Sequence, residues 1–227
     1  MNIIFKPEIK SLGEFQPNYI FHSNQIKNEL MFFGCNIEFI RAREAQAPIT
    51  NALIDEVLKQ MAFEYYGKIG LPTDYIVVDT RVTMLMPGQY PSIPGWHCDD
   101  VPRTQGQPDF SKPLNCQHYM CLVSANRDGI IKCPSSTEFI TSTHEFEINP
   151  LKVWQSLHEQ AELVEKKTRF VKEREIVKFN QLAIHRASPA VSGGWRLFFR
   201  LSLTDRPPTN EVRNQVQIYV DPNQAGW

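Results

Sequence analysis

The sequence predicts a β-rich domain of the α+β class, with helices packed on the outside of its sheets. Three observations predict it. Several stretches of strand length are apolar throughout or alternate in polarity, only two stretches show helical periodicity, and the 227 residues include 16 prolines. The sequence has no internal repeat, low-complexity tract or linker, so the whole chain, 1–227, is expected to form one domain.

Five stretches have the pattern of strands: 76–86, about 119–123, about 138–141, 175–187 and 195–204. Because successive side chains of a strand point to opposite faces, the first stretch has an apolar and a polar face. The apolar face carries Ile76, Val78, Val82, Met84 and Met86, and the other carries Asp79, Arg81 and Thr83. We expect a structural ion pair between Arg81 and Asp79 rather than a substrate contact.

Two stretches show the periodicity of helices. The first begins near Pro48 and is expected to end at Gly67 and Gly70. Its apolar stripe consists of Leu53, Ile54, Val57, Leu58 and Met61. The second begins at Asn149 and Pro150, a cap followed by a proline in the first turn. Its apolar residues are Leu151, Trp154, Leu157, Ala161 and Val164, and Lys166 and Lys167 are expected in its last turn.

Composition excludes several classes of protein. Lys and Arg number 24 against 25 Asp and Glu, so a broad surface for nucleic acid or membrane is not expected. No apolar stretch approaches the ~20 residues of a membrane-spanning helix. The number of cysteines, five, is odd, and no two of them form a C-x-x-C pair, which favours reduced thiols. The sequence therefore predicts a soluble cytoplasmic protein and leaves its oligomeric state open.

The stretch 195–204 is the most informative strand. Its odd positions are all apolar, whereas its even positions include Arg196 and Arg200 together with Ser202 and Thr204. The polar face either meets solvent or lines the interior of the domain. In the interior the two guanidinium groups would need anionic partners, because a buried unpaired charge is very costly. An arginine fork suits a carboxylate well.

Three residues could bind a metal ion together. His97 and Asp99 share one face if their segment is extended, and His185 is the candidate for a third ligand on a neighbouring strand. Two histidines and one carboxylate leave coordination positions open, an arrangement typical of non-haem Fe(II). A hairpin at Ser192-Gly193-Gly194 would return Arg196 to the side of His185.

The ordered set of His97-x-Asp99, His185 and then Arg196 resembles the Fe(II)- and 2-oxoglutarate-dependent oxygenases. The stretches MPGQYPSIPGWHCDD and FNQLAIHRASPAVSGGWRLFFRLSL carry the resemblance, which covers about 75–205. It implies a double-stranded β-helix, or jelly-roll (cupin-like) barrel, over 75–205, with helical or irregular support from 1–74.

The resemblance also implies the chemistry. Fe(II) would be held by His97, Asp99 and His185, and the co-substrate 2-oxoglutarate by Arg196 or Arg200. With dioxygen, such enzymes oxidise a substrate and release succinate and carbon dioxide. The chain lacks the N-x-T-x-R run of the branch that repairs alkylated nucleic acid, and Asp99 stands where the halogenating branch has a small residue. Hydroxylation of a small-molecule or amino-acid-type substrate is therefore expected.

Two other classes of function stay open. One is a non-catalytic jelly-roll module for binding or assembly, against which the complete set of His97, Asp99 and His185 argues. The other is a cupin-like metalloenzyme that does not use 2-oxoglutarate, for which Arg196 would have no evident purpose. Binding of Fe(II) and consumption of 2-oxoglutarate distinguish the three.

Overall fold

The computed structural model describes residues 1–17, 21–29, 34–45, 47–64, 74–125, 134–212 and 218–220. Four helices occur in this part of the chain: α1 (Ser23–Asn28), α2 (Phe39–Glu44), α3 (Pro48–Glu64) and α4 (Val153–Leu163). The strands are β1 (Asn2–Phe5), β2 (Ile9–Glu14), β3 (Gly34–Cys35), β4 (Ile37–Glu38), β5 (Tyr75–Leu85), β6 (Arg103–Thr104), β7 (Gln107–Pro108), β8 (Gln117–Ser124), β9 (Thr137–Ile140), β10 (His144–Glu147), β11 (Thr168–Phe170), β12 (Glu175–Asn180), β13 (His185–Ala187), β14 (Gly194–Thr204) and β15 (Glu211–Val212). The predicted β-rich composition is confirmed.

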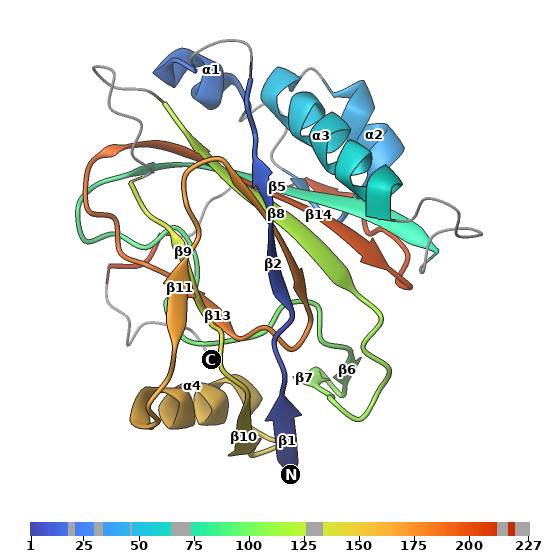
Figure 1. Cartoon of the computed structure of the whole chain (residues 1–227), viewed down its shortest axis with the longest axis vertical. Coiled ribbons are helices and arrows are strands. Elements are labelled where there is room, and N and C mark those ends of the chain that lie inside the picture. Colours follow the sequence, from blue (N-terminus) through green and yellow to red (C-terminus); the bar gives the residue numbers. More distant parts are fainter. Residues whose placement is uncertain are drawn as a thin grey trace.

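A six-stranded antiparallel sheet forms the centre of the molecule, in the order β2-β12-β8-β14-β5-β4 (Figure 1). The strand β14 lies between β8 and β5 and pairs with β5 along its whole length. Its apolar odd positions, among them Leu197, Phe199 and Leu201, pack in one core cluster with Leu53 and Val57 of α3. The helices α1, α2 and α3 therefore cover one face of the sheet, since Ile26, Ala42 and Leu53 belong to this cluster.

A three-stranded sheet, β11-β9-β13, packs on the opposite face. Phe139 of β9 meets Phe179 of β12 edge to face, with ring centroids 5.0 Å apart. Met120 and Leu122 of β8 belong to the same buried cluster. The two sheets thus form layers around a second core, but the described strands do not close into a barrel, so the predicted jelly-roll barrel is not confirmed.

The predicted strand 175–187 is two strands in two different sheets. β12 ends at Asn180, and β13 begins at His185 in the three-stranded sheet. Between them the side-chain amide of Gln181 accepts a hydrogen bond from the Cys116 N–H (2.9 Å) through Oε1 and donates one to the Asp100 carbonyl through Nε2. These bonds hold the chain in a turn where alternation alone indicated a continuous strand.

The second predicted helix is shorter than expected at both ends. The Asn149 side chain accepts a hydrogen bond from the Leu151 N–H (3.0 Å), which makes a turn, and α4 begins only at Val153. It ends at Leu163, so the positions expected for Lys166 and Lys167 in its last turn are wrong. The first helix begins at Pro48 as predicted, while Gly67 and Gly70 lie outside the described residues.

Both ends of the chain contribute to the sheets. The segment 1–74, expected to be helical or irregular, contains α1, α2 and α3, and it also supplies strands: β1 pairs with β10, and β2 and β4 form the two edges of the six-stranded sheet. Near the other end, Tyr219 exchanges two backbone hydrogen bonds with Tyr90 (2.7 and 3.1 Å), in the loop that leads to His97. No helix in the described part of the chain is both long and apolar enough to cross a membrane.

Truncation of Phe199 to alanine should destabilise the protein severely. Phe199 is fully buried between the sheet and α3, so Phe199→Ala is expected to lower the free energy of unfolding by about 3–5 kcal/mol. The matched control is Met84→Ala on β5, because Met84 was expected on an apolar face but is 42% exposed. Urea unfolding measures both, and equal losses in the two variants would contradict the described core.

Candidate metal centre

His97 and His185 lie side by side because their backbones pair directly. The His97 N–H donates to the His185 carbonyl (3.0 Å), and the His185 N–H donates to the His97 carbonyl (2.9 Å). Directly opposed residues of an antiparallel pair project to the same face, and the two imidazole rings are 4.7 Å apart between centroids. A loop residue is thereby joined to β13, whose other edge pairs with β9.

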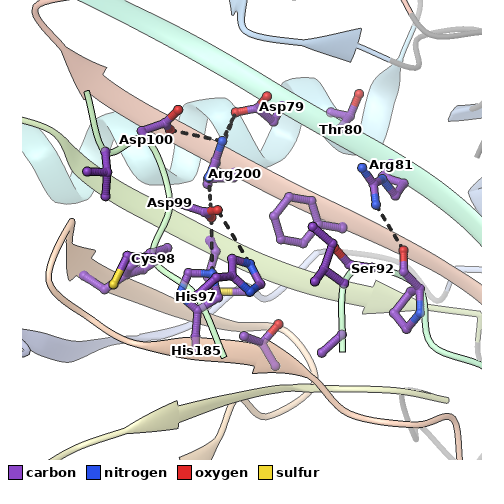
Figure 2. Close-up of a pocket in the computed structure, with 18 of the residues that line it drawn as sticks. Asp79, Thr80, Arg81, Ser92, His97, Cys98, Asp99, Asp100, His185 and Arg200 are labelled. Carbon is purple, nitrogen blue, oxygen red and sulfur yellow. Dashed lines mark hydrogen bonds and ion pairs between the residues drawn. The ribbon is translucent and has the colours of Figure 1, made fainter. Parts of the chain in front are cut away.

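Asp99 completes the group that the sequence predicts. Its Oδ2 lies 3.3 Å from Nε2 of His185, and its Oδ1 lies 3.9 Å from Nε2 of His97. One ligand atom from each of the three residues falls within 4.8 Å of the others. Figure 2 shows the three side chains directed toward one another. The three predicted ligands are therefore brought together at one point.

The backbone fixes which nitrogen of each histidine faces that point. Nδ1 of His97 lies 2.8 Å from the Gly95 carbonyl, and Nδ1 of His185 lies 2.9 Å from the Ala183 carbonyl. Because a carbonyl oxygen only accepts, each Nδ1 carries the hydrogen, and each Nε2 is directed toward Asp99. Histidines that bind metals are commonly oriented by this kind of bond.

The ionisation of these groups suits a cation. Burial, followed by the charge of His185, lowers the pKa of His97 to about 4, so His97 is neutral at pH 7. Burial alone would raise the pKa of Asp99, but Arg200 and the two histidines outweigh it and hold that pKa well below its usual range. The site therefore presents one carboxylate and an unprotonated Nε2 of His97.

Arg200 connects the site to the six-stranded sheet. Its guanidinium contacts three carboxylates, those of Asp79 (2.7 Å), Asp100 (3.2 Å) and Asp99 (Figure 2). The pKa of Arg200 would fall through burial, but the three carboxylates raise it well above its usual value. Arg200, one of the two arginines expected to hold 2-oxoglutarate, is thus engaged with three carboxylates of the protein itself.

A second group of ligand-type residues, Asp100, Cys116 and His118, lies next to the first. The Nδ1 of His118 that faces Asp100 (3.8 Å) already lies 2.8 Å from the Ser202 hydroxyl, whereas Nε2 of His97 and Nε2 of His185 face Asp99. Burial and the charge of Asp100 raise the pKa of the Cys116 thiol to about 12, so this thiol is protonated at neutral pH. The thiolate is the form that binds metals, so the first group is the better candidate for a metal centre.

A cavity of about 350 Å³ lies at the candidate centre and is lined from both sheets. Arg196 is buried and lines it from β14, opposite Thr83 on β5 and Ser124 on β8. The predicted hairpin between His185 and Arg196 is wrong, because β13 and β14 belong to different sheets. Arg196 faces the same cavity as His185 across the gap between the layers.

Some residues of the site were not predicted. The carboxylate of Asp79, expected to pair with Arg81, accepts hydrogen bonds from Nε (3.1 Å) and Nη2 (2.7 Å) of Arg200. Asp79 and Arg200 are opposed in the β5–β14 register, which polarity patterns did not specify. Trp154 of α4 lines the cavity in a T-shaped contact with His97, with ring centroids 6.5 Å apart, and no motif marked it.

No protein-family model, curated protein or solved structure gives a significant match to this chain. The function proposed below is inferred from the sequence pattern and the geometry of the site.

Removal of the Arg200 charge should destabilise the fold. Arg200→Met leaves three neighbouring carboxylates without their shared cation, and loss of one partner of a buried ion pair costs about 3–5 kcal/mol. Arg43→Met breaks an exposed pair with Asp55 and should cost at most about 1 kcal/mol. Chemical denaturation at pH 7 compares the two, and similar losses would contradict a bracing role for Arg200.

The metal-free protein should lose stability as the pH falls from about 6.5 to about 4. In that window His97 binds a proton in the unfolded chain but not in the folded one, so acidification favours unfolding. The loss from this residue is up to about 3 kcal/mol. The free energy of unfolding is measured against pH in the presence of a chelator, for wild type and for His97→Gln. The difference between the two proteins gives the contribution of His97. A difference that does not vary with pH would refute the expected titration.

Proposed function

We propose that this protein is a non-haem Fe(II)- and 2-oxoglutarate-dependent dioxygenase that hydroxylates a small-molecule or amino-acid-type substrate. The observation that carries the proposal is the convergence of ligand atoms from His97, Asp99 and His185 at one wall of a cavity. Two imidazoles and one carboxylate form a ligand set typical of non-haem iron oxygenases.

The residues present fit an Fe(II) ion. Both histidines are held through Nδ1, and Asp99 supplies the negative charge. Fe(II) would be held by these three side chains and, with 2-oxoglutarate and dioxygen, would supply the oxidation of a C–H bond with release of succinate and carbon dioxide. The protein contributes position and electrostatics.

Arg196 would hold the distal carboxylate of 2-oxoglutarate. The hydroxyls of its register partners, Thr83 and Ser124, are buried and have no hydrogen-bond partner among the described residues. An unsatisfied buried hydroxyl costs free energy, whereas a carboxylate could accept from both. A guanidinium flanked by two such donors is suited to bind and orient a carboxylate.

The fold proposed with this function is the distorted jelly roll of the family. The two packed sheets would be its major and minor sheets, with His97 extending the minor sheet beside β13. In this arrangement, apolar residues such as Phe179, Phe198 and Met120 would limit the access of water to the cavity.

Anaerobic titration tests the proposal. Addition of Fe(II) and then 2-oxoglutarate to wild type should produce the weak visible charge-transfer band of the chelate, and aerobic turnover should release succinate. His97→Ala should abolish the band because a ligand is lost. Arg196→Ala should weaken the affinity for 2-oxoglutarate at least ~10-fold, because a buried charge-assisted contact is lost.

Arg41→Ala, on the exposed surface of α2, is the matched control and should behave as wild type. An unchanged band in a folded His97→Ala protein would refute the proposed centre. Metal binding without any effect of 2-oxoglutarate would favour a metalloenzyme that uses no keto acid, and absence of both would favour a binding module.

A further inference from the structure

Three arginines project from the six-stranded sheet toward the cavity: Arg81, Arg196 and Arg200. They lie on neighbouring strands and on one face, since directly opposed residues share a face. On this face the register pairs of β5 and β14 are, in order, Asp79 with Arg200, Arg81 with Phe198, and Thr83 with Arg196. Arg81 therefore lies between Arg200, which contacts Asp99, and Arg196, which is assigned to the co-substrate.

The other two arginines already have a role. Arg200 is engaged with three carboxylates, and Arg196 is assigned to 2-oxoglutarate in the proposed function. Arg81 donates from Nη1 to the Pro91 carbonyl (3.1 Å). Figure 2 draws this bond as the dashed line at Arg81. This bond fixes the guanidinium against the loop Pro91–Ile93, which lines the same cavity.

The formal charge of the cavity favours a further anion. Among the described residues, its lining contains five arginines (Arg81, Arg103, Arg196, Arg200 and Arg206) and three aspartates (Asp79, Asp99 and Asp100), which leaves two positive charges. The charges of Fe(II) and of 2-oxoglutarate cancel, so the loaded site would keep this excess. A cleft with a net positive charge attracts anions.

We propose that the substrate of this site is a small molecule with a carboxylate or phosphate group, and that Arg81 binds this group. The inference rests on the proposed function and adds the chemical class of the substrate. The cavity volume of about 350 Å³ suits a small molecule. Phe198, opposite Arg81, and Trp154 provide apolar surface for the rest of it.

Matched small probes test the proposal on protein loaded with redox-inert Mn(II) and 2-oxoglutarate. Benzoate and phenyl phosphate are titrated calorimetrically beside benzamide, which has a similar shape but no charge. At least one anion should bind wild type ~10-fold or more tighter than benzamide. Preference for benzoate indicates a carboxylate, and preference for phenyl phosphate indicates a phosphate.

Variants then locate the anion. Arg81→Gln should weaken binding of the preferred anion at least ~10-fold, and Arg81→Lys, which keeps the charge but not the fork, should give an intermediate loss. The affinity of Arg81→Gln for 2-oxoglutarate should stay within about twofold of wild type. Arg41→Gln, which removes a surface arginine outside the cavity, should change neither affinity.

Two results with wild type would overturn the proposal: no binding of either anion up to ~10 mM, or benzamide binding as tightly as the anions. Two results with the variants would also overturn it: both Arg81 variants binding the anion as tightly as wild type, or Arg81→Gln losing as much affinity for 2-oxoglutarate as for the anion. Failure of wild type to bind 2-oxoglutarate would instead overturn the oxygenase function. The anion titration is then repeated with Mn(II) alone, where a loss in Arg81→Gln but not in Arg196→Gln supports the anion site separately.

Discussion

The paired backbones of His97 and His185 are the constraint on which the candidate site depends. These two hydrogen bonds join a loop to the three-stranded sheet and place both imidazoles on one side. Asp99 then reaches the same point because it follows His97 by two residues. The carbonyls of Gly95 and Ala183 each bind the Nδ1 of one histidine. Local backbone geometry therefore determines that the Nε2 atoms face Asp99.

The second requirement is charge compensation between the two sheets. Three aspartates approach one another near the candidate metal centre, and this concentration of negative charge is tolerable because Arg200 is shared among them. Arg200 also sets the pKa of Asp99 low, so the carboxylate is ionised whether or not a cation is bound. The same residue thus supports the fold and the chemical state of a candidate ligand.

Much of this arrangement could be predicted from local patterns. The alternation in β14 separated a buried apolar face from the face that carries Arg196 and Arg200, and the H-x-D motif with His185 identified three residues that do converge. The partners of Arg200 could not be predicted, because they depend on the register between β5 and β14, which are far apart in sequence. The turn after β12 was not predicted either, because the Gln181 hydrogen bonds that hold it join backbone groups far away in the sequence.

The pairing of Tyr90 with Tyr219 has a consequence for how the centre is held. A segment near the carboxyl end is fastened to the loop that delivers His97, although it supplies none of the three ligand atoms. Such a tether restricts the conformations open to the loop. In the proposed function the loop would therefore lose less entropy when an ion binds, and changes near residue 219 would weaken that binding at a distance from the three candidate ligands.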